Sequence, residues 1–451
     1  MSSTEILNPA TGETITQVEQ TPLEDVDAAI ALAKRAFESW RAVDPADRAR
    51  LLRRFADAVE ADIPHLADLE VRSAGHTIGN ATWEAGNVRD VLTYYAGGIE
   101  RQSGRQIPVP GGVNITFHEP LGVVGVIVPW NFPMPIAGWG FAPALAAGNT
   151  VVLKPAEVTP LTALRLGELA LEAGLPEGVF TVLPGKGSVV GDRFVTHPDV
   201  RKVVFTGSTE VGRRIMAGCS EQVKRLTLEL GGKNSNIVFG DADLQAAAAA
   251  APGGAFDNAG QDCCSRARLL VESSAMDRFL ELLEPAVKGF VCTDPSSAEA
   301  EMGPLITAAH RDKVAGYVDG ASVLFQGAAP SGSGFWFPPT VLDSREGTAD
   351  FDEEIFGPVI SVVPFEDEAD AIRIANSTEY GLSGSLWTRD VGRALRVSRA
   401  VEAGNLSVNS HASVRYWTPF GGFKQSGFGR ELGPDAPDAF TETKNVFISS
   451  E

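Results

Sequence analysis

Hydrophobic residues recur at helical spacing near the start of the chain. Val26, Ile30 and Ala33 follow Pro22 at intervals of three or four residues, the period of a helix that buries one face. Similar but weaker patterns continue for about seventy residues, and we interpret them as a helical layer that covers part of a sheet. Residues 21–72 are predicted to form two helices, the first from Pro22 and the second including 50–61, and a weaker third covers 83–97.

A different pattern follows, in which every second residue is apolar. Ile107 and Val109 precede a Pro-Gly-Gly turn, and Val113, Ile115 and Phe117 follow it. Strict alternation around a glycine turn predicts a β-hairpin over residues 105–119. Such a hairpin between helices either contacts a partner subunit or covers the sheet.

From residue 123 the chain alternates between short, continuously apolar runs and helical patterns. Strands that are apolar on both faces and separated by helices indicate an open parallel sheet. The predicted strands are 123–129, 150–153, 179–183, 203–206 and 225–230, and the intervening helices are 139–147, 161–173, 188–195 and 210–219.

Polar residues stand directly after these strands. In open parallel sheets ligands bind at the carboxyl ends of the strands, so these positions are candidates for a site. A G-x-G-x-x-G fingerprint is missing, but Gly207 and Gly212 enclose a strand-to-helix turn suited to a pyrophosphate. The candidates are Trp130, Asn131, Lys154, Glu157, Gly207, Ser208 and Glu229.

A second α/β region begins near Asn234, after an uninterrupted series of five strands. It carries an alanine-rich helical run (245–251) and ends in a glycine-rich loop from Phe420 to Gly427 and a last strand, 440–448. Its predicted strands are 268–271, 383–387 and 404–409, and its helices 276–290, 301–317, 367–376 and 391–401.

Composition limits the function further. The chain has 451 residues and a net charge of −20, which disfavours nucleic acid or an anionic membrane as partner. Four cysteines form no disulfide framework, and neither they nor the histidines have the spacing of a metal site. No apolar run approaches the roughly 20 residues of a membrane span. The first residues lack the features of a secretory signal, so we expect a cytoplasmic protein.

Two adjacent thiols, Cys263 and Cys264, follow Gly260 and Gln261. A thiol in a tight glycine turn that is partly exposed is a candidate nucleophile, because the thiolate is the reactive form. On this stretch alone, the alternative of two small buried residues is favoured.

Together these segments resemble the aldehyde dehydrogenase superfamily, of the NAD(P)-dependent hydrolytic type, over nearly the whole chain. The matching motifs begin with Asn8–Gly12 and continue through Pro129–Pro133, Lys154–Glu157, Phe205–Thr209, Glu229–Lys233, Asn258–Cys263, Glu354–Pro358 and Phe420–Gly429. The resemblance implies an α/β fold: a Rossmann-like cofactor domain with an open parallel sheet, a second α/β catalytic domain and a small β oligomerisation element. The corresponding residues are 1–101 with 121–231, then 232–427, then 102–120 with 428–451.

By this resemblance Cys263 is the nucleophile that forms a thiohemiacetal and then a thioester, while Cys264 is a bystander. Glu229 matches the general base and indicates release of a free acid by hydrolysis. The side-chain amide of Asn131 and the backbone N–H of Cys263 match the donors to the oxyanion.

The resemblance also implies the cofactor contacts. Lys154 and Glu157 match residues on the adenosine ribose, where a carboxylate repels a 2′-phosphate and so favours NAD over NADP. Gly207 and Ser208 match the pyrophosphate turn. Glu354 matches the residue that holds the nicotinamide ribose, with Phe356 and Trp130 nearby.

The substrate tunnel of the resembled family corresponds to Trp139, Asp257 and Phe420. Asp257 departs from the aromatic residue often found there, and it suits a cationic aminoaldehyde. Arg415, in the loop before Phe420, would suit a carboxylate, so a carboxylated semialdehyde is the alternative substrate class. A cysteine esterase or thioesterase built on Cys263 is the alternative activity. We also expect a homodimer or homotetramer.

Overall fold

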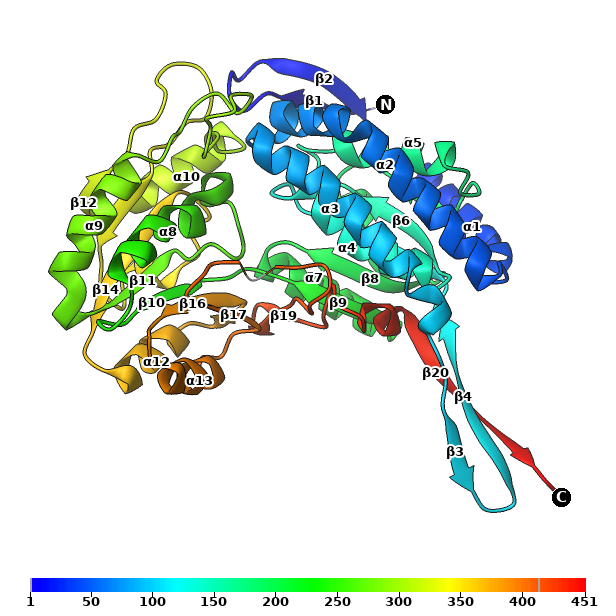
Figure 1. Cartoon of the computed structure of the whole chain (residues 1–451). Helices are drawn as coiled ribbons and strands as arrows, with labels where there is room; N and C mark the ends of the chain where they lie inside the picture. Colours follow the sequence, from blue (N-terminus) through cyan, green and yellow to red (C-terminus); the bar gives the residue numbers. More distant parts are fainter. Residues whose placement is uncertain (1, 413) are drawn as a thin grey trace.

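The first lobe is built on a six-stranded sheet. The structure is a computed structural model that describes residues 2–412 and 414–451. Strand order is β19-β9-β8-β5-β6-β7, with every pairing parallel except that of β19 with β9 (Figure 1). The strands are β5 (Val123–Ile127), β6 (Thr150–Lys154), β7 (Phe180–Val182), β8 (Val200–Thr206), β9 (Arg225–Glu229) and β19 (Gly427–Phe428). The predicted open parallel sheet is confirmed.

Helices cover both faces of this sheet because its strands are apolar on both sides. Val124 and Val126 of β5 face one core, while Val123 and Ile127 of the same strand face another. The first core contains α2 (Pro45–Ala74), α3 (Ile78–Ala96), α4 (Pro133–Ala146) and α5 (Leu161–Glu172); the second contains α1 (Leu23–Trp40), α6 (Asp192–Thr196) and α7 (Thr209–Ser220).

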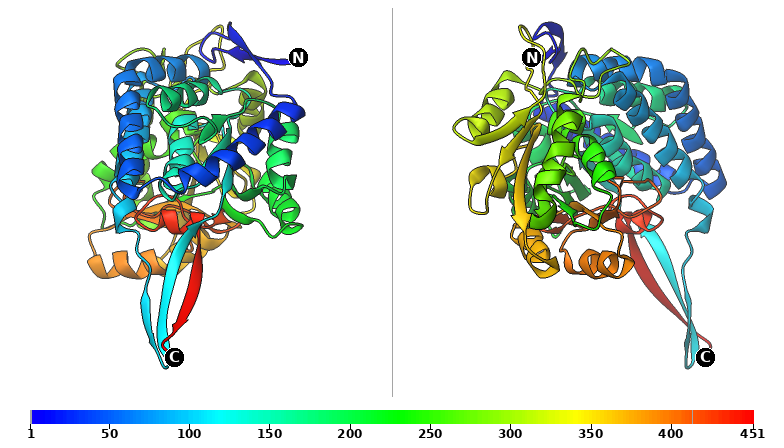
Figure 2. Two further views of the ribbon diagram at one scale, coloured as in Figure 1. Left: turned by 90° about the vertical axis from the view of Figure 1, so that its right-hand side faces the viewer. Right: turned by 60° about the vertical axis from the view of Figure 1, so that its left-hand side comes forward.

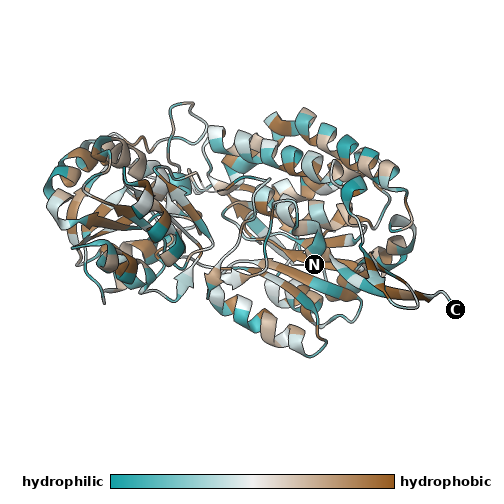
Figure 3. Cartoon of the chain, turned by 60° about the horizontal axis from the view of Figure 1, so that its bottom comes forward, coloured by the Kyte–Doolittle hydropathy of each residue, from teal (hydrophilic) through white to brown (hydrophobic). Residues whose placement is uncertain are grey.

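The second lobe carries a seven-stranded sheet of order β12-β13-β14-β11-β10-β16-β17, parallel except at β12. Helices again cover both faces, and Figure 3 shows hydrophobic colour along the strands of both lobes. The strands are β10 (Ser235–Val238), β11 (Arg268–Glu272), β12 (Ser322–Gln326), β13 (Thr340–Asp343), β14 (Val359–Phe365), β16 (Ser383–Trp387) and β17 (Asn405–Val408). The helices are α8 (Leu244–Phe256), α9 (Met276–Lys288), α10 (Ala308–Val318), α12 (Glu368–Asn376) and α13 (Val391–Ala400).

A three-stranded antiparallel arm projects from the first lobe (Figures 1 and 2). The predicted hairpin forms β3 (Gln106–Val109) and β4 (Gly112–Pro120), and the C-terminal strand β20 (Thr441–Ser449) pairs with β4. The arm stands away from both sheets, so the hairpin does not cover a sheet. A separate hairpin at the N-terminus, β1 (Ser3–Leu7) with β2 (Thr14–Glu19), has no counterpart in the predicted elements.

Among the helices in the described part of the chain, none is both long and apolar enough to cross a membrane.

Candidate active site

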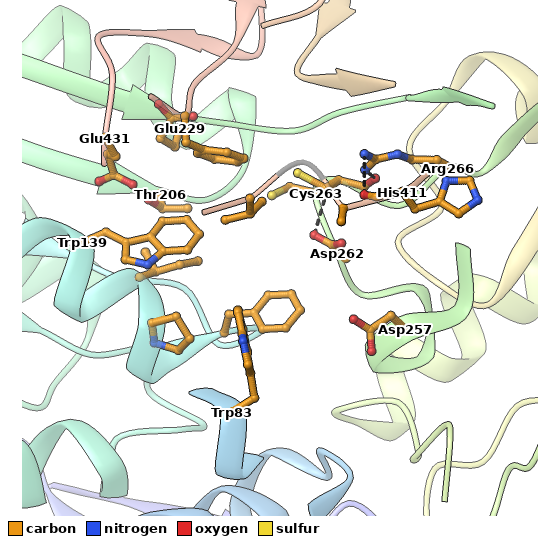
Figure 4. A pocket seen from close by; sticks show the side chains of 17 residues that line it. Trp83, Trp139, Thr206, Glu229, Asp257, Asp262, Cys263, Arg266, His411 and Glu431 are labelled. Carbon is orange, nitrogen blue, oxygen red and sulfur yellow. Dashed lines mark hydrogen bonds between the residues drawn. The ribbon is translucent and has the colours of Figure 1, made fainter. Parts of the chain in front are cut away.

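Two clefts meet between the lobes, and Thr206, Glu229 and Cys263 line both of them. One cleft opens at the carboxyl ends of β5, β8 and β9. The other lies on the opposite side of Cys263 and is shown in Figure 4. A thiol at the junction of two clefts is placed to meet one molecule from each side.

The first cleft lies where the strand order of the parallel sheet reverses. The chain proceeds from β5 to β6 and β7 on one side and returns to β8 and β9 on the other, which makes the β5–β8 boundary the switch point where such sheets bind ligands. Of the predicted site residues, the cleft is lined by Trp130, Asn131, Gly207, Ser208, Glu229, Cys263, Glu354 and Phe356.

Lys154 and Glu157 lie apart from this group, after β6, and line neither cleft. The ammonium of Lys154 donates to the carbonyl of Pro155 at 2.7 Å, and burial lowers its pKa to about 8. Glu157 Oε1 accepts from the backbone N–H of Gly187 at 3.2 Å.

The first cleft has features that fit a dinucleotide. Helix α7, twelve residues long, begins at its wall, with Ser208 as N-cap and Gly207 before it. Free N–H groups at a helix start attract phosphate. A side chain at Gly207 would approach the Phe205 ring to 2.6 Å, so the turn admits only glycine without rearrangement. Trp130 and Phe356 line the cleft with their rings perpendicular, centroids 5.4 Å apart.

The loop that presents Cys263 is strained and held in place. Asn258, Ala259 and Gly260 all have positive φ, of 49°, 54° and 69°; for alanine this costs about 1 kcal/mol. Gln261 anchors the loop, since its Oε1 accepts from the N–H of Ile306 at 2.9 Å and its Nε2 donates to Asn258 at 3.0 Å. A fixed loop holds the thiol in one position.

The Cys263 thiol is partly exposed, whereas Cys264 is buried with 5% of its surface accessible. A hydrogen bond with Cys264 and burial raise the pKa of Cys263 well above its ordinary value, and Asp262 and Glu354 raise it further. The resting thiol is therefore neutral near pH 7, and attack requires transfer of its proton.

Two hydrogen-bond donors stand near the thiol. Asn131 Nδ2 donates one of its two hydrogens to the carbonyl of Gln261 at 3.0 Å, which fixes the amide and leaves the second hydrogen. Asn258 Nδ2 holds the backbone of Asn131 by donating to its carbonyl at 2.7 Å. Among the described residues, the N–H of Cys263 has no hydrogen-bond acceptor. The pair can receive a developing oxyanion.

Glu229 is buried, with 3% of its surface accessible, and neither carboxylate oxygen has a hydrogen-bond partner among the described residues. Burial, and then the neighbouring Glu431, raise its pKa well above 4.5. Glu431 is equally buried and unpartnered, with its pKa raised to about 8. Glu431 was absent from the predicted site, because a glutamate shortly after a glycine-rich loop gives no signal of burial.

The second cleft is lined by aromatic and acidic side chains (Figure 4). Trp139 packs against Phe420 with centroids 5.4 Å apart, and its indole donates to Asn87 at 2.9 Å. Asp257 faces the cleft and accepts from Asn80 Nδ2 at 2.6 Å. All three predicted tunnel residues line this cleft; Asp262, Arg266 and His411 do so as well and were not predicted.

Behind the second cleft, a charged cluster is sealed inside the first lobe. Glu70, His76 and Glu84 are at most 2% accessible, and His76 Nδ1 lies 2.6 Å from Glu84 and 3.8 Å from Glu70. Burial, with a contribution from Glu84, raises the pKa of Glu70 to about 8. The cluster was not predicted, because its members lie within and between helices whose patterns indicate only scaffold.

This raised pKa gives stability a pH dependence. The folded chain keeps a proton on Glu70 that the unfolded chain, with its ordinary value of 4.5, releases. The contribution of Glu70 to the free energy of unfolding is therefore greatest below pH 4.5. It falls by about 1.4 kcal/mol per pH unit as the pH rises towards 8. Glu70→Gln removes the titration. We expect its melting temperature, relative to wild type, to increase steadily from pH 5.5 to 8, as measured by scanning calorimetry.

The exposed Glu24, on the first turn of α1, supplies the control for this series. Glu24→Gln is expected to differ from wild type by a constant amount over the same pH range. A difference between Glu70→Gln and wild type that does not change with pH would show that Glu70 is ionised in the folded chain.

The chain is similar to known proteins over nearly its whole length. The model of the aldehyde dehydrogenase family matches residues 1–446. An aldehyde dehydrogenase of Emericella nidulans is 42% identical, covering 98% of this chain and 91% of the relative. The betaine aldehyde dehydrogenase of Bacillus subtilis is 40% identical, over 99% and 94%. The crystal structure of Staphylococcus aureus betaine aldehyde dehydrogenase in complex with NAD+ superposes with a TM-score of 0.97 at 37% identity, covering 100% of this chain and 92% of the other.

Proposed function

Because the chain belongs to the aldehyde dehydrogenase family, we propose that it oxidises an aldehyde to the carboxylic acid with NAD as acceptor. The observation that carries this assignment is the position of Cys263, where a switch-point cleft and an aromatic, acidic cleft meet with Glu229 between them. Absorbance at 340 nm with NAD and a panel of aldehydes tests it, and no increase with any aldehyde would refute it.

Each step of the proposed reaction is assigned to particular residues of the chain. The Cys263 sulfur attacks the carbonyl carbon, and Asn131 Nδ2 and the Cys263 N–H receive the oxyanion of the thiohemiacetal. NAD, when bound in the first cleft, would supply the acceptor for the hydride. Glu229 takes a proton from the water that hydrolyses the resulting thioester. Burial, and then Glu431, raise the pKa of Glu229, so its carboxyl must lose its proton before it can act as a base.

The first cleft is the place for the cofactor. Gly207, Ser208 and the start of α7 would bind its pyrophosphate, Glu354 and Phe356 would hold the nicotinamide end, and Trp130 would line the wall. Lys154 and Glu157 would extend this site to the adenosine ribose at the neighbouring strand end. The carboxylate of Glu157 favours NAD over NADP, and the Staphylococcus aureus relative was crystallised with NAD+.

For the substrate, we propose an aminoaldehyde. Asp257 faces the second cleft and is paired with a neutral amide, not with an arginine. Arg415, which would support a carboxylated semialdehyde, is exposed and does not line this cleft. Among the described residues lining it, His411 is the one histidine. Its Nδ1 lies 2.9 Å from Ser385 Oγ, and its Nε2 has no hydrogen-bond partner among the described residues. No histidine that the structure describes in this cleft is therefore paired with the Cys263 thiol, which leaves a cysteine–histidine esterase without support.

Asp257→Asn tests this assignment. Loss of the negative charge is expected to lower kcat/KM for an ω-aminoaldehyde about tenfold, the effect of roughly 1.4 kcal/mol, mainly through KM. A neutral aldehyde of the same length, measured in parallel, is expected to react equally well with both proteins. Equal kcat/KM of the wild type for both aldehydes would contradict the assignment.

We also propose a homo-oligomer built through the arm. The strands of the arm expose large apolar side chains. Strand β17 forms an edge of the second sheet, and its last residue, Val408, is exposed. Exposed apolar patches and open edges are normally covered. The exposed arm residues are Ile107, Val113, Phe117, Phe447 and Ile448.

Light scattering is expected to give a dimer or a tetramer of the 47.7 kDa chain. Phe447→Asp together with Ile448→Asp is expected to shift the mass towards one chain. Leu171→Asp, at a similarly exposed position on α5, is the matched control and is expected to leave the mass unchanged. A wild-type mass near 47.7 kDa would contradict the proposal.

A further inference from the structure

Asp262 occupies a position directly beside the nucleophile. One oxygen of its carboxylate and the sulfurs of Cys263 and Cys264 all lie within 4.8 Å of one another. The side chain lines the second cleft, and Figure 4 shows it between Cys263 and Asp257. Its Oδ1 accepts from the N–H of Cys264 at 2.8 Å, which fixes its orientation.

The cleft around Asp262 is lined by acidic side chains. Among the described residues that line this cleft, four are acidic and Arg266 is the one lysine or arginine. The Arg266 guanidinium donates to neutral acceptors, namely the carbonyl of Cys264, Ser385 Oγ at 3.1 Å and the carbonyl of His411 at 3.2 Å. Burial raises the pKa of Asp262 above its ordinary value, although the charge of Arg266 and hydrogen bonds from Cys264 and Cys263 oppose this shift. The four acidic residues are Glu229, Asp257, Asp262 and Glu431.

A carboxylate this close to a thiol opposes formation of the thiolate. Asp262 is among the groups that raise the pKa of Cys263, and it also raises the pKa of Asp257. The carboxylate of Asp262 therefore increases the free energy needed to form the Cys263 thiolate, and a cation bound nearby would offset this cost.

We propose that Asp262 and Asp257 together form a cation subsite beside Cys263, which selects aldehydes whose positively charged nitrogen lies only a few bonds from the carbonyl carbon. The cation of the bound substrate offsets the charge of Asp262, so a correct substrate also favours the thiolate that attacks it. With a neutral aldehyde, no substrate charge adds to the partial offset that Arg266 provides. Asp262 is thus a specificity-determining residue, separate from the general base Glu229. This inference rests on the proposed function, in which Cys263 attacks the carbonyl.

The test measures the thiol directly and needs neither NAD nor turnover. Methanethiosulfonate reagents transfer a sulfenyl group to a thiolate, with formation of a disulfide and release of a sulfinate. The ethylammonium reagent is cationic and the ethylsulfonate reagent, of similar size, is anionic. Second-order rate constants are measured by mass spectrometry of the peptide containing Cys263, with Cys263→Ser as the blank.

For the wild type we expect the cationic reagent to react at least about 100-fold faster than the anionic one, which corresponds to about 2.7 kcal/mol. A carboxylate a few ångströms from the thiol attracts the cationic reagent and repels the anionic one by more than this even at an effective dielectric constant near 20. Asp262→Asn keeps the shape and the acceptor for the Cys264 N–H, and it is expected to reduce this ratio about tenfold or more. Asp262→Glu, which keeps the charge, is expected to restore most of it. Asp277→Asn, on the exposed side of α9 and away from both clefts, is the charge-matched control and is expected to leave the ratio unchanged.

The outcomes separate the inference from the proposed function. An enzyme that reduces NAD with aldehydes but shows no preference between the reagents, or the same preference in Asp262→Asn, overturns the cation subsite and leaves the activity standing. A charge preference that depends on Asp262 in a protein that reduces no NAD supports the subsite and overturns the proposed function.

Discussion

Replacement of Cys263 by serine is expected to reduce NAD-dependent aldehyde oxidation by a factor on the order of 10³ or more. A serine hydroxyl in this position has no adjacent base strong enough to ionise it, and an oxygen ester cannot replace the thioester as an equally reactive intermediate. The loop around residue 263 is held by Gln261 and Asn258, which the substitution leaves in place. Initial rates at 340 nm with saturating NAD measure the loss.

The neighbouring thiol supplies the matched control. Cys264 is buried, with 5% of its surface accessible, and packs in the core of the first lobe. Cys264→Ser therefore changes an adjacent sulfur in the same loop without removing the partly exposed one, and we expect it to keep activity of the wild-type order. Activity that survives in Cys263→Ser and disappears in Cys264→Ser would reverse the assignment of the two cysteines.

The sheet and the strand-end residues could be predicted from the sequence because both depend on local pattern. Apolar runs such as 123–127 define buried parallel strands, and the residues after them must gather at one edge. Asn131, Gly207 and Glu229 meet in the cleft for this reason. The alternation around the Pro-Gly-Gly turn predicted the hairpin of β3 and β4 equally well.

Local pattern failed where a proline or an exposed strand disguised an element. The clear helical pattern at 50–61 covers only the middle of helix α2, which extends from Pro45 to Ala74. Pro64 lies inside this helix, and proline usually marks the end of one. The hairpin β1–β2 and strand β12 are largely exposed, so they lack the apolar runs that mark buried strands.

The missed site residues have a different cause, which is contact between distant parts of the chain. Glu431 meets Glu229 across about two hundred residues, and Asn80 meets Asp257 at a sequence separation of 177. Asp262 stands next to the nucleophile in the sequence, but only the fold shows which way its carboxylate faces. The chemistry of a single acidic residue depends on such neighbours, and sequence spacing contains no information about them.

Glu229→Gln is expected to lower the steady-state kcat by a factor on the order of 10² to 10⁴, the usual contribution of a general base. The glutamine has nearly the same shape, and in the buried position beside Glu431 it carries no negative charge, so the fold should tolerate it. If Glu229 activates the hydrolytic water, the first turnover still proceeds. A rapid burst of NADH close to one per active site, followed by a slow phase, is then the expected time course.

The pH dependence distinguishes Glu229 from other bases. A base acts only when deprotonated, and burial and Glu431 raise the pKa of Glu229 well above 4.5. The kcat–pH profile of the wild type should therefore have an ascending limb at pH values above those at which an ordinary glutamate titrates. The profile of Glu229→Gln should lack that limb. Loss of the burst itself, with slower modification of Cys263, would instead place the action of Glu229 on the thiol. An unchanged kcat and an unchanged limb would exclude it from both steps, because its buried carboxyl would then have no part in moving a proton.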